Sequence, residues 1–128
     1  MQEKNNPLSP HLQIYRWQIS SLLSITHRIV GVINILAISA ICFWSLFLLL
    51  GAESYEVLNI FFNSFFGKFT AVGLCWTFSF HILNELRHLF WDMGYGFDLK
   101  ISRITGVLAL VGSFVLTIIF YLIGKNFI

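Results

Sequence analysis

The uncharged stretch from Ile29 to Gly51, IVGVINILAISAICFWSLFLLLG, decides the fold of this chain. A membrane-spanning helix requires about 20 consecutive, mainly apolar residues. Two further stretches approach this pattern: Phe69 to Trp91, where the first charge is Glu85, and Ile104 to Gly124, which has none. The sequence therefore predicts three transmembrane helices, at 29–51, 69–91 and 104–124.

The composition indicates that lipid is the main solvent of this protein. Hydrophobic residues make up 57% of the 128 residues and charged residues only 11%, whereas a soluble domain carries about 25% charged residues. The mean hydropathy is +0.78. We predict one all-α domain over residues 1–128, an integral membrane three-helix bundle. A net charge of +2 without a run of basic residues argues against nucleic acid as a partner.

The first helix is predicted to be longer than its span. With Ser20 as N-cap, a helix from Ser21 to Leu50 would be about 45 Å long against a hydrocarbon core of about 30 Å. Residues 7–28 should therefore form an interfacial segment and the start of this helix. The connecting segments 52–68 and 92–103 are predicted to be loops, the second with a turn at Gly94 and Gly96.

The distribution of basic residues predicts the orientation. Six lie in the N-terminal segment or near the second connection, and two lie on the opposite side: Lys4, Arg16, Arg28, Arg87, Lys100 and Arg103 against Lys68 and Lys125. Because basic residues accumulate on the inner side of a membrane, the N-terminus should face the cytoplasm or the mitochondrial matrix.

Four residues near the start of the first helix form a polar stripe. Ser24, His27, Arg28 and Gly31 recur at i, i+3, i+4 and i+7, a spacing that places them on one helical face. A hydroxyl, an imidazole and a cation suit a polar ligand, and Gly31 would let a large group approach the backbone. The alternative is an interfacial helix end whose arginine reaches lipid headgroups.

A second stripe consists of His81, Glu85, His88 and Asp92, at i, i+4, i+7 and i+11. His81 lies about 15 Å from the inner end of its helix by helical rise, where an ionisable residue is costly and normally has a partner. That partner is a side chain, a proton path or a metal, since neutral imidazole is a common haem ligand. Arg87 points away from this stripe and is interpreted as a topology anchor.

His81 and His88 cannot both bind the same haem iron. They lie about 10.5 Å apart along one helical face, whereas two axial ligands must approach the iron from opposite sides of the ring. A second ligand is therefore expected from another chain.

Three motifs together resemble a known family. PLSPHLQIYRW at Pro7 to Trp17, SITHRIVG at Ser24 to Gly31 and HILNELRHLFWDMGYG at His81 to Gly96 are similar to the large cytochrome b membrane-anchor subunit of succinate dehydrogenase, respiratory complex II. The resemblance implies three transmembrane helices that pair with a small anchor subunit, share one haem b with it and bind ubiquinone as substrate. It also implies an iron–sulfur subunit and a flavoprotein as partners, in the mitochondrial inner membrane or the bacterial plasma membrane.

The resemblance carries specific roles to five positions. It implies that His81 is an axial ligand of the haem iron, and that Ser24 and Arg28 bind the quinone. It places His27, together with Arg28, near the haem propionates. It makes Asp92 a candidate proton relay. The oxidation of succinate belongs to the other subunits.

One departure from the family pattern keeps other functions open. The pattern H-x-x-x-G-x-R-H has glycine where this chain has Glu85, and a carboxylate there either clashes with the macrocycle or pairs with a basic group of a partner chain. The alternatives are a structural anchor without haem, a fumarate reductase anchor, and a small transporter or proton channel that uses the stripe from His81 to Asp92.

Overall fold

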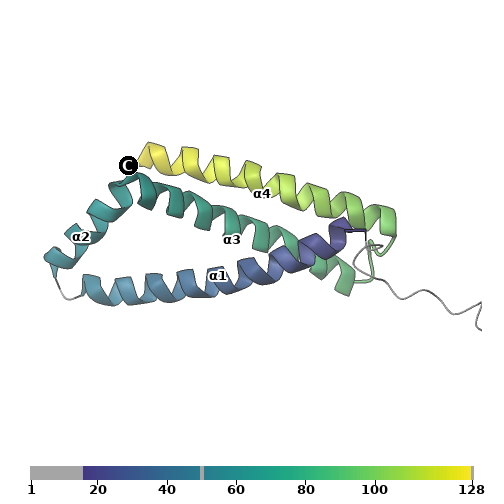
Figure 1. Ribbon diagram of the computed structural model, residues 1–128, viewed down its shortest axis with the longest axis horizontal. Coiled ribbons are helices and arrows are strands. Elements are labelled where there is room, and N and C mark those ends of the chain that lie inside the picture. The colour runs from purple at the N-terminus through teal and green to yellow at the C-terminus, as the bar shows by residue number, and fades with distance from the viewer. Residues whose placement is uncertain (1–15, 50, 128) are drawn as a thin grey trace, which may run out of the picture.

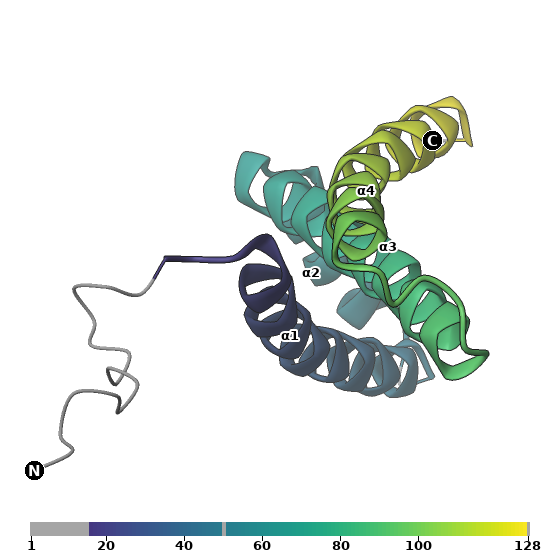
Figure 2. The same ribbon diagram turned by 90° about the vertical axis from the view of Figure 1, so that its right-hand side faces the viewer.

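Helices account for all regular secondary structure in the part of the chain that the computed structural model describes, residues 16–49 and 51–127. They are α1 (Ile19–Leu48), α2 (Ala52–Asn63), α3 (Phe65–Asp92) and α4 (Leu99–Phe127). The three long helices lie side by side, and the short α2 lies across one end (Figure 1). The view along the helices shows α3 between α1 and α4 (Figure 2). The all-α prediction is confirmed.

The predicted loop at 52–68 is wrong, because most of this segment is helical. Gly51, with a φ of 130°, separates α1 from α2 in a conformation that glycine adopts readily. At the other end of α2, the axis turns by 85° into α3. Ser64 caps α3 there, its side-chain oxygen accepting a hydrogen bond from Gly67 N at 3.1 Å. The two glutamates that suggested a loop are compatible with a helix, since glutamate is a good helix former.

Two predicted helix starts are shifted. α1 begins at Ile19 with Gln18 as N-cap, so Ser20 lies inside the helix. The bond from Leu22 N to the Gln18 carbonyl, 3.2 Å long, closes this first turn. α4 begins at Leu99 rather than after residue 103. The turn predicted between α3 and α4 is present, with φ of 85° at Gly94 and 81° at Gly96. Residues 7–15 of the predicted interfacial segment lie outside the described residues.

Two helices in the described ranges are candidate membrane spans by length and composition. These are α1, with a mean hydropathy of 2.3 in its most apolar window, and α4, with 2.5 between Leu99 and Lys125. α3 reaches this level only together with the bent α2, because the second half of α3 carries two histidines, two acids and Arg87. The third span at 69–91 and the three-span bundle therefore stay predictions.

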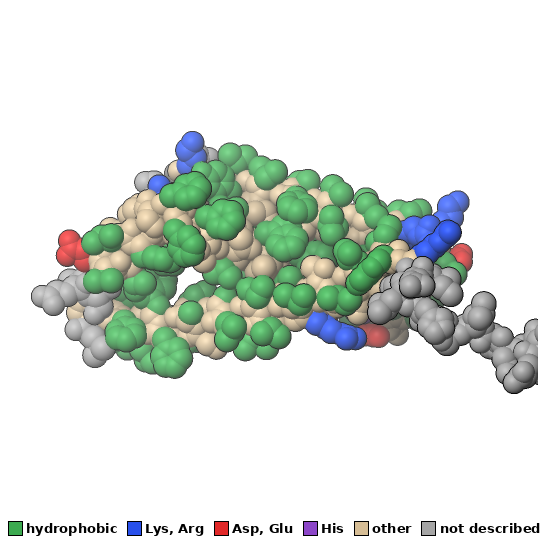
Figure 3. Space-filling view, in the orientation of Figure 1, with side chains coloured by type: hydrophobic (Ala, Val, Ile, Leu, Met, Phe, Trp, Pro, Cys, Tyr) green, Lys and Arg blue, Asp and Glu red, His purple; other side chains and the backbone are tan. Residues whose placement is uncertain are grey.

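The packing places small and polar side chains inside and large apolar ones outside. Besides a few apolar residues such as Leu23 and Phe80, the buried positions hold Asn34, Thr77, Ser79, Asn84, Arg87, Ser113 and Thr117. Large apolar side chains cover much of the outer surface (Figure 3). Membrane helices pack in this way, because lipid solvates apolar residues and leaves polar ones to contact other helices.

The start of α1, the end of α3 and the start of α4 lie at the same end of the molecule (Figure 1). The described basic residues that were predicted to lie on the inner side belong to these segments: Arg16, Arg28, Arg87, Lys100 and Arg103. The side of the membrane that this end faces stays a prediction.

Candidate functional site

The two stripes predicted on separate helices meet where α1 packs against α3. The ring of His27 stacks on the ring of His81, with centroids 4.4 Å apart and an interplanar angle of 23°. It also stacks on His88, at 5.4 Å and 29°. His81 and His88 therefore lie on one face of α3, as predicted, and that face is directed at α1. The packing turns two linear motifs into one cluster.

Glu85 belongs to the same cluster. Its Oε1 lies 3.1 Å from Nε2 of His27 and 4.0 Å from Nε2 of His81. The shorter contact lacks hydrogen-bond geometry, so the buried His27 Nε2 has no hydrogen-bond partner, and neither has Nδ1 of His81. Within the described chain, these three side chains form the group that could hold a metal ion, with ligand atoms within 4.8 Å of one another.

The close packing at this cluster depends on a glycine. A Cβ atom at Gly31 would lie 3.4 Å from Cε1 of His81, at the short limit of ordinary van der Waals contact. The close approach predicted at Gly31 is therefore made by the imidazole of His81. A larger residue would push this ring away from α1.

The side chains of the cluster differ in their access from outside. His27 is the most enclosed, with 18% of its side chain exposed, against 32% for His81 and 56% for Glu85. His81 is thus reachable from the outer surface of the α1–α3 pair. A ligand or a partner chain at that surface can contact its imidazole.

The other predicted site residues lie outside the contacts of this cluster. Ser24 and Arg28 are exposed on α1, and Asp92 is the exposed last residue of α3. Within the described ranges, no carboxylate forms an ion pair with Arg28. The structure gives these three residues a position and leaves their functional roles as predictions.

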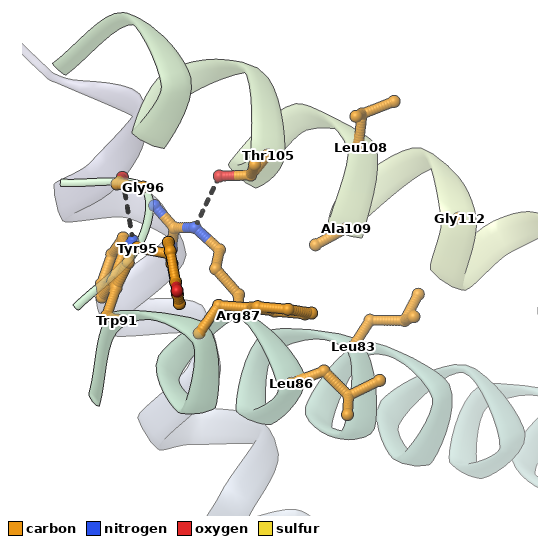
Figure 4. A pocket seen from close by; sticks show the side chains of 11 residues that line it. Leu83, Leu86, Arg87, Trp91, Tyr95, Gly96, Thr105, Leu108, Ala109 and Gly112 are labelled. Atoms are coloured by element: carbon orange, nitrogen blue, oxygen red, sulfur yellow. Dashed lines mark hydrogen bonds between the residues drawn. The ribbon is translucent and has the colours of Figure 1, made fainter. Parts of the chain in front are cut away.

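Arg87 is the residue that the sequence interpretation missed. Instead of facing the membrane surface as an anchor, its side chain is buried between α3 and α4. Its Nε donates a hydrogen bond to the Thr105 hydroxyl (3.2 Å), and its Nη2 donates to the backbone and side-chain oxygens of Ser102. The guanidinium lies 4.1 Å from the ring centre of Trp91. Figure 4 shows the hydrogen bond from Arg87 to Thr105 and the position of Trp91.

The sequence feature that could have predicted the burial of Arg87 lies in α4. Ser102, Thr105 and Gly106 follow i, i+3 and i+4 spacing, and small or hydroxyl residues on one face mark a helix contact in membrane proteins. A Cβ atom at Gly106 would collide with Leu23 of α1 and lie 3.7 Å from Nη2 of Arg87. All three long helices therefore meet near this glycine.

Buried amides form a second contact that was not predicted. Nδ2 of Asn34 in α1 lies 3.4 Å from the Thr77 carbonyl oxygen in α3. Asn84 is almost completely buried, and its backbone oxygen lies 2.8 Å from Nδ1 of His88. The bond of Asn34 therefore links α1 to α3, whereas the contact of His88 with Asn84 lies within α3.

Apolar helices with a polar interior, and a histidine–carboxylate cluster towards one end, define a helical membrane protein with a buried polar site. The chain belongs to the family described as "Succinate dehydrogenase/Fumarate reductase transmembrane subunit", which matches residues 2–120.

Individual relatives agree with this assignment. The chain is 42% identical to the succinate dehydrogenase cytochrome b556 subunit of Rickettsia felis over 115 residues, 90% of each chain. It is 32% identical to the cytochrome b556 subunit of Paracoccus denitrificans, covering 90% of this chain and 88% of the relative. It is 37% identical to the cytochrome b560 subunit of Reclinomonas americana, covering 93% and 86%. The resemblance to a cytochrome b membrane anchor of succinate dehydrogenase is confirmed.

Proposed function

We propose that this chain is the large anchor of a succinate:quinone oxidoreductase, which helps to bind haem b and ubiquinone and to pass electrons from the iron–sulfur subunit to the quinone. The observation that carries this proposal is the imidazole of His81. It is reachable from outside the α1–α3 pair, and its Nε2 makes no hydrogen bond within the described chain, the nearest carboxylate oxygen being 4.0 Å away. Such an imidazole suits an axial ligand of haem iron.

The contacts of His81 support a second ligand from the partner anchor subunit. His27 stacks on His81 with centroids only 4.4 Å apart, and this leaves no space for a macrocycle between the two rings. His88 lies on the same side of α3. Neither histidine can therefore approach the iron from the opposite face. We propose that His27 would instead contact the edge of the haem, near its propionates.

Haem can bind to His81 only if the side chain of Glu85 moves. Its carboxylate lies 4.0 Å from Nε2 of His81, in space that an iron bound to that nitrogen would need. The side chain is more than half exposed and has three rotatable bonds, so it can turn away. With that rotation, the donor set fits haem b. The haem, when bound, supplies a one-electron carrier close to the quinone.

Ser24 and Arg28 are proposed to bind the quinone. Both are exposed on α1 in the stripe that contains His27, so a ligand can reach them. The Ser24 hydroxyl would donate a hydrogen bond to a quinone oxygen, and Arg28 would stabilise the negative charge that develops there. Donors placed in advance are most effective where water is scarce. Asp92, at the end of α3, would transfer protons from the aqueous side.

The proposed assembly places this end of the helices at the cytoplasm or mitochondrial matrix. Five of the seven described basic residues lie in or next to the segments at this end, and the positive-inside rule favours that orientation. The iron–sulfur subunit, carrying the flavoprotein, would dock here. The exposed apolar surface of the helices would contact lipid and the small anchor subunit.

Substitution at the quinone site tests this proposal. In the purified complex, Ser24→Ala or Arg28→Ala should lower succinate–quinone activity by about 100-fold, the usual effect of losing one placed donor. Reduction of a soluble dye by succinate should be unchanged. Thr26→Ala is the matched control, because the Thr26 hydroxyl already donates to Leu22 O in its own helix at 2.9 Å. Unchanged quinone reduction in both variants would refute the site.

A structural anchor without haem is the second candidate function. The contact between Glu85 and His27, at 3.1 Å, favours it, because a closed cluster leaves His81 Nε2 facing a carboxylate. A reduced-minus-oxidised optical spectrum of the intact complex decides between the two. Haem b bands support the first function, and their absence supports the second. Fumarate reductase anchors belong to the same family, and assays of succinate oxidation against fumarate reduction distinguish the direction.

A further inference from the structure

A cavity of about 450 Å³ lies between α3 and α4, on the side of α3 away from the histidine cluster. It is far larger than the roughly 30 Å³ of a water molecule, and its volume falls within the range of ligand sites. Leu83, Leu86, Arg87, Trp91, Thr105 and Ala109 are among its lining residues. Figure 4 shows these side chains converging from the two helices.

One end of the cavity carries a buried positive charge. Only 8% of Arg87 is exposed. Its three hydrogen bonds go to neutral oxygens of Ser102 and Thr105, and no carboxylate in the described ranges forms an ion pair with it. These bonds use Nε and Nη2, and no described residue accepts a hydrogen bond from Nη1. A buried cation without a counter-charge is costly, so the site favours an anion.

The rest of the cavity is apolar and leads along the helices. Leu83, Leu86 and Ala109 form its walls, and the exposed Phe90 and Leu108 lie at its outer edge. An inorganic anion would contact only the end at Arg87 and leave these walls uncovered. A ligand with one anionic end and one long apolar part would cover both.

The polar end has the composition of a membrane interface. Trp91 and Tyr95 line the cavity beside Arg87, and these residue types concentrate at the level of lipid headgroups. Lys100 and Arg103 are exposed in the first turns of α4, at the same end. Basic residues in this position attract anionic lipids.

We propose that this cavity binds an anionic phospholipid from the leaflet at the end of the bundle where α3 ends and α4 begins. The phosphate accepts hydrogen bonds from Nη1 of Arg87, and one acyl chain lies between α3 and α4 along Leu83 and Ala109. The lipid then compensates the buried charge and covers the groove. The site uses the side of α3 opposite to His81, and its lining contains none of the residues assigned to the haem or the quinone, although Trp91 also contacts the ring of His88.

The first experiment measures the phospholipid that the complex retains. The purified complex is incubated with phosphatidylglycerol or phosphatidylcholine and washed with mild detergent, and bound lipid is counted by native mass spectrometry. We expect the wild type to retain phosphatidylglycerol in preference to phosphatidylcholine, and Arg87→Gln to retain about tenfold less, because the charge-assisted bonds are lost. Lys68→Gln, which removes an exposed cation at the opposite end of α3, should behave as the wild type.

A second variant separates lipid loss from a damaged fold. Ala109→Phe leaves Arg87 intact and fills the apolar part of the cavity, so it should also lose the phosphatidylglycerol. Retention of this lipid by either variant would overturn the proposal. So would a wild-type complex that retains no phospholipid or binds phosphatidylcholine equally well.

A measurement on the wild type does not depend on any variant. Phosphatidylglycerol with a photoreactive diazirine in its acyl chain should label peptides that contain Leu83 or Ala109. Labelling confined to α1, or a cross-link that shows a partner subunit seated between α3 and α4, would exclude the lipid from this cavity.

Discussion

The ionisable residues on the two sides of α3 differ in their exposure and in their hydrogen bonds. Towards α1, three histidines and Glu85 contact one another and remain partly exposed, with buried nitrogens that lack hydrogen-bond partners. Towards α4, Arg87 is buried and hydrogen-bonded to Ser102 and Thr105. The polar groups on the α1 side therefore have bonding capacity that this chain does not use, whereas the hydrogen bonds on the α4 side hold α3 and α4 together.

This difference shows how one helix can serve both function and assembly. Groups that bind a cofactor or substrate must keep unused bonding capacity and an open path, at some cost in stability. Groups that fix helix packing use their capacity within the chain. The unpaired nitrogens in the histidine cluster therefore indicate a binding site. The hydrogen bonds of Arg87 through Nε and Nη2 indicate a structural role, and only its Nη1 is left to bind the proposed lipid.

Loss of the His81 imidazole, on the α1 side of α3, should have the largest effect, which is on the haem content. We expect His81→Ala to lower the haem b content of the purified complex by at least about tenfold. Loss of a group that only supports a metal ligand already lowers metal affinity by about tenfold, and loss of the ligand itself should lower it further. The optical spectrum of the reduced complex measures this. His88→Ala is the control, since His88 lies on the same face of α3 and is not proposed as a ligand. Equal haem loss in both variants would contradict the assignment.

Substitution at the helix crossing should weaken the α4 side. A valine at Gly106 collides with Leu23 of α1, and overpacking of this kind costs about 2 kcal/mol. We expect a lower thermal unfolding temperature for Gly106→Val. Gly73→Val is the matched control, because a Cβ atom at Gly73 meets nothing within 4 Å. Similar unfolding temperatures for the two variants would show that the crossing at Gly106 is not tightly packed in the membrane.

Removal of the carboxylate should change the haem without removing it. Glu85→Gln eliminates the negative charge of a side chain that has to turn away from Nε2 of His81, 4.0 Å from its Oε1 here, before iron can bind. We expect the haem midpoint potential to rise by at most roughly 40 mV, equivalent to the about 1 kcal/mol of a well-screened charge at 4 Å. A redox titration followed by absorbance measures the shift. Glu56→Gln in α2, at the other end of the molecule, should leave the potential unchanged. An unchanged potential in Glu85→Gln would mean that the carboxylate has turned far from the haem.

Loss of one hydroxyl on the α4 side should have the smallest effect. Thr105→Val removes the oxygen that accepts from Nε of Arg87, and such bonds between membrane helices contribute about 0.6 kcal/mol. A small decrease in unfolding temperature should result. Thr70→Val is the control, because the Thr70 hydroxyl bonds within its own helix, to Phe66 O. A large decrease in the unfolding temperature of Thr105→Val would mean that loss of this one bond also breaks the hydrogen bonds from Arg87 to Ser102.

The sequence predicted each side of α3 to a different degree. Helical spacing alone placed His81 and His88 on one face, because the period of an α-helix is fixed. It could not show that His27 would stack between them, since that contact depends on how α1 and α3 pack. It also treated Arg87 as an anchor, because a basic residue near a helix end has the same local pattern whether it is buried or exposed.

The second helix was missed for a related reason. Segment 52–63 has a lower apolar content than the spans and contains two glutamates, so hydropathy alone suggested a loop. Hydropathy measures neither helix propensity nor the backbone breaks at Gly51 and Ser64 that separate this helix from its neighbours.

Apolar runs and local motifs are properties of the chain, and they are sufficient to identify an all-helical membrane protein of the succinate dehydrogenase and fumarate reductase anchor family. The contact between the two polar stripes and the burial of Arg87 beside an apolar cavity became visible only in the packed helices. These features depend on which helix faces meet, and many contacts distributed over three helices determine that geometry together.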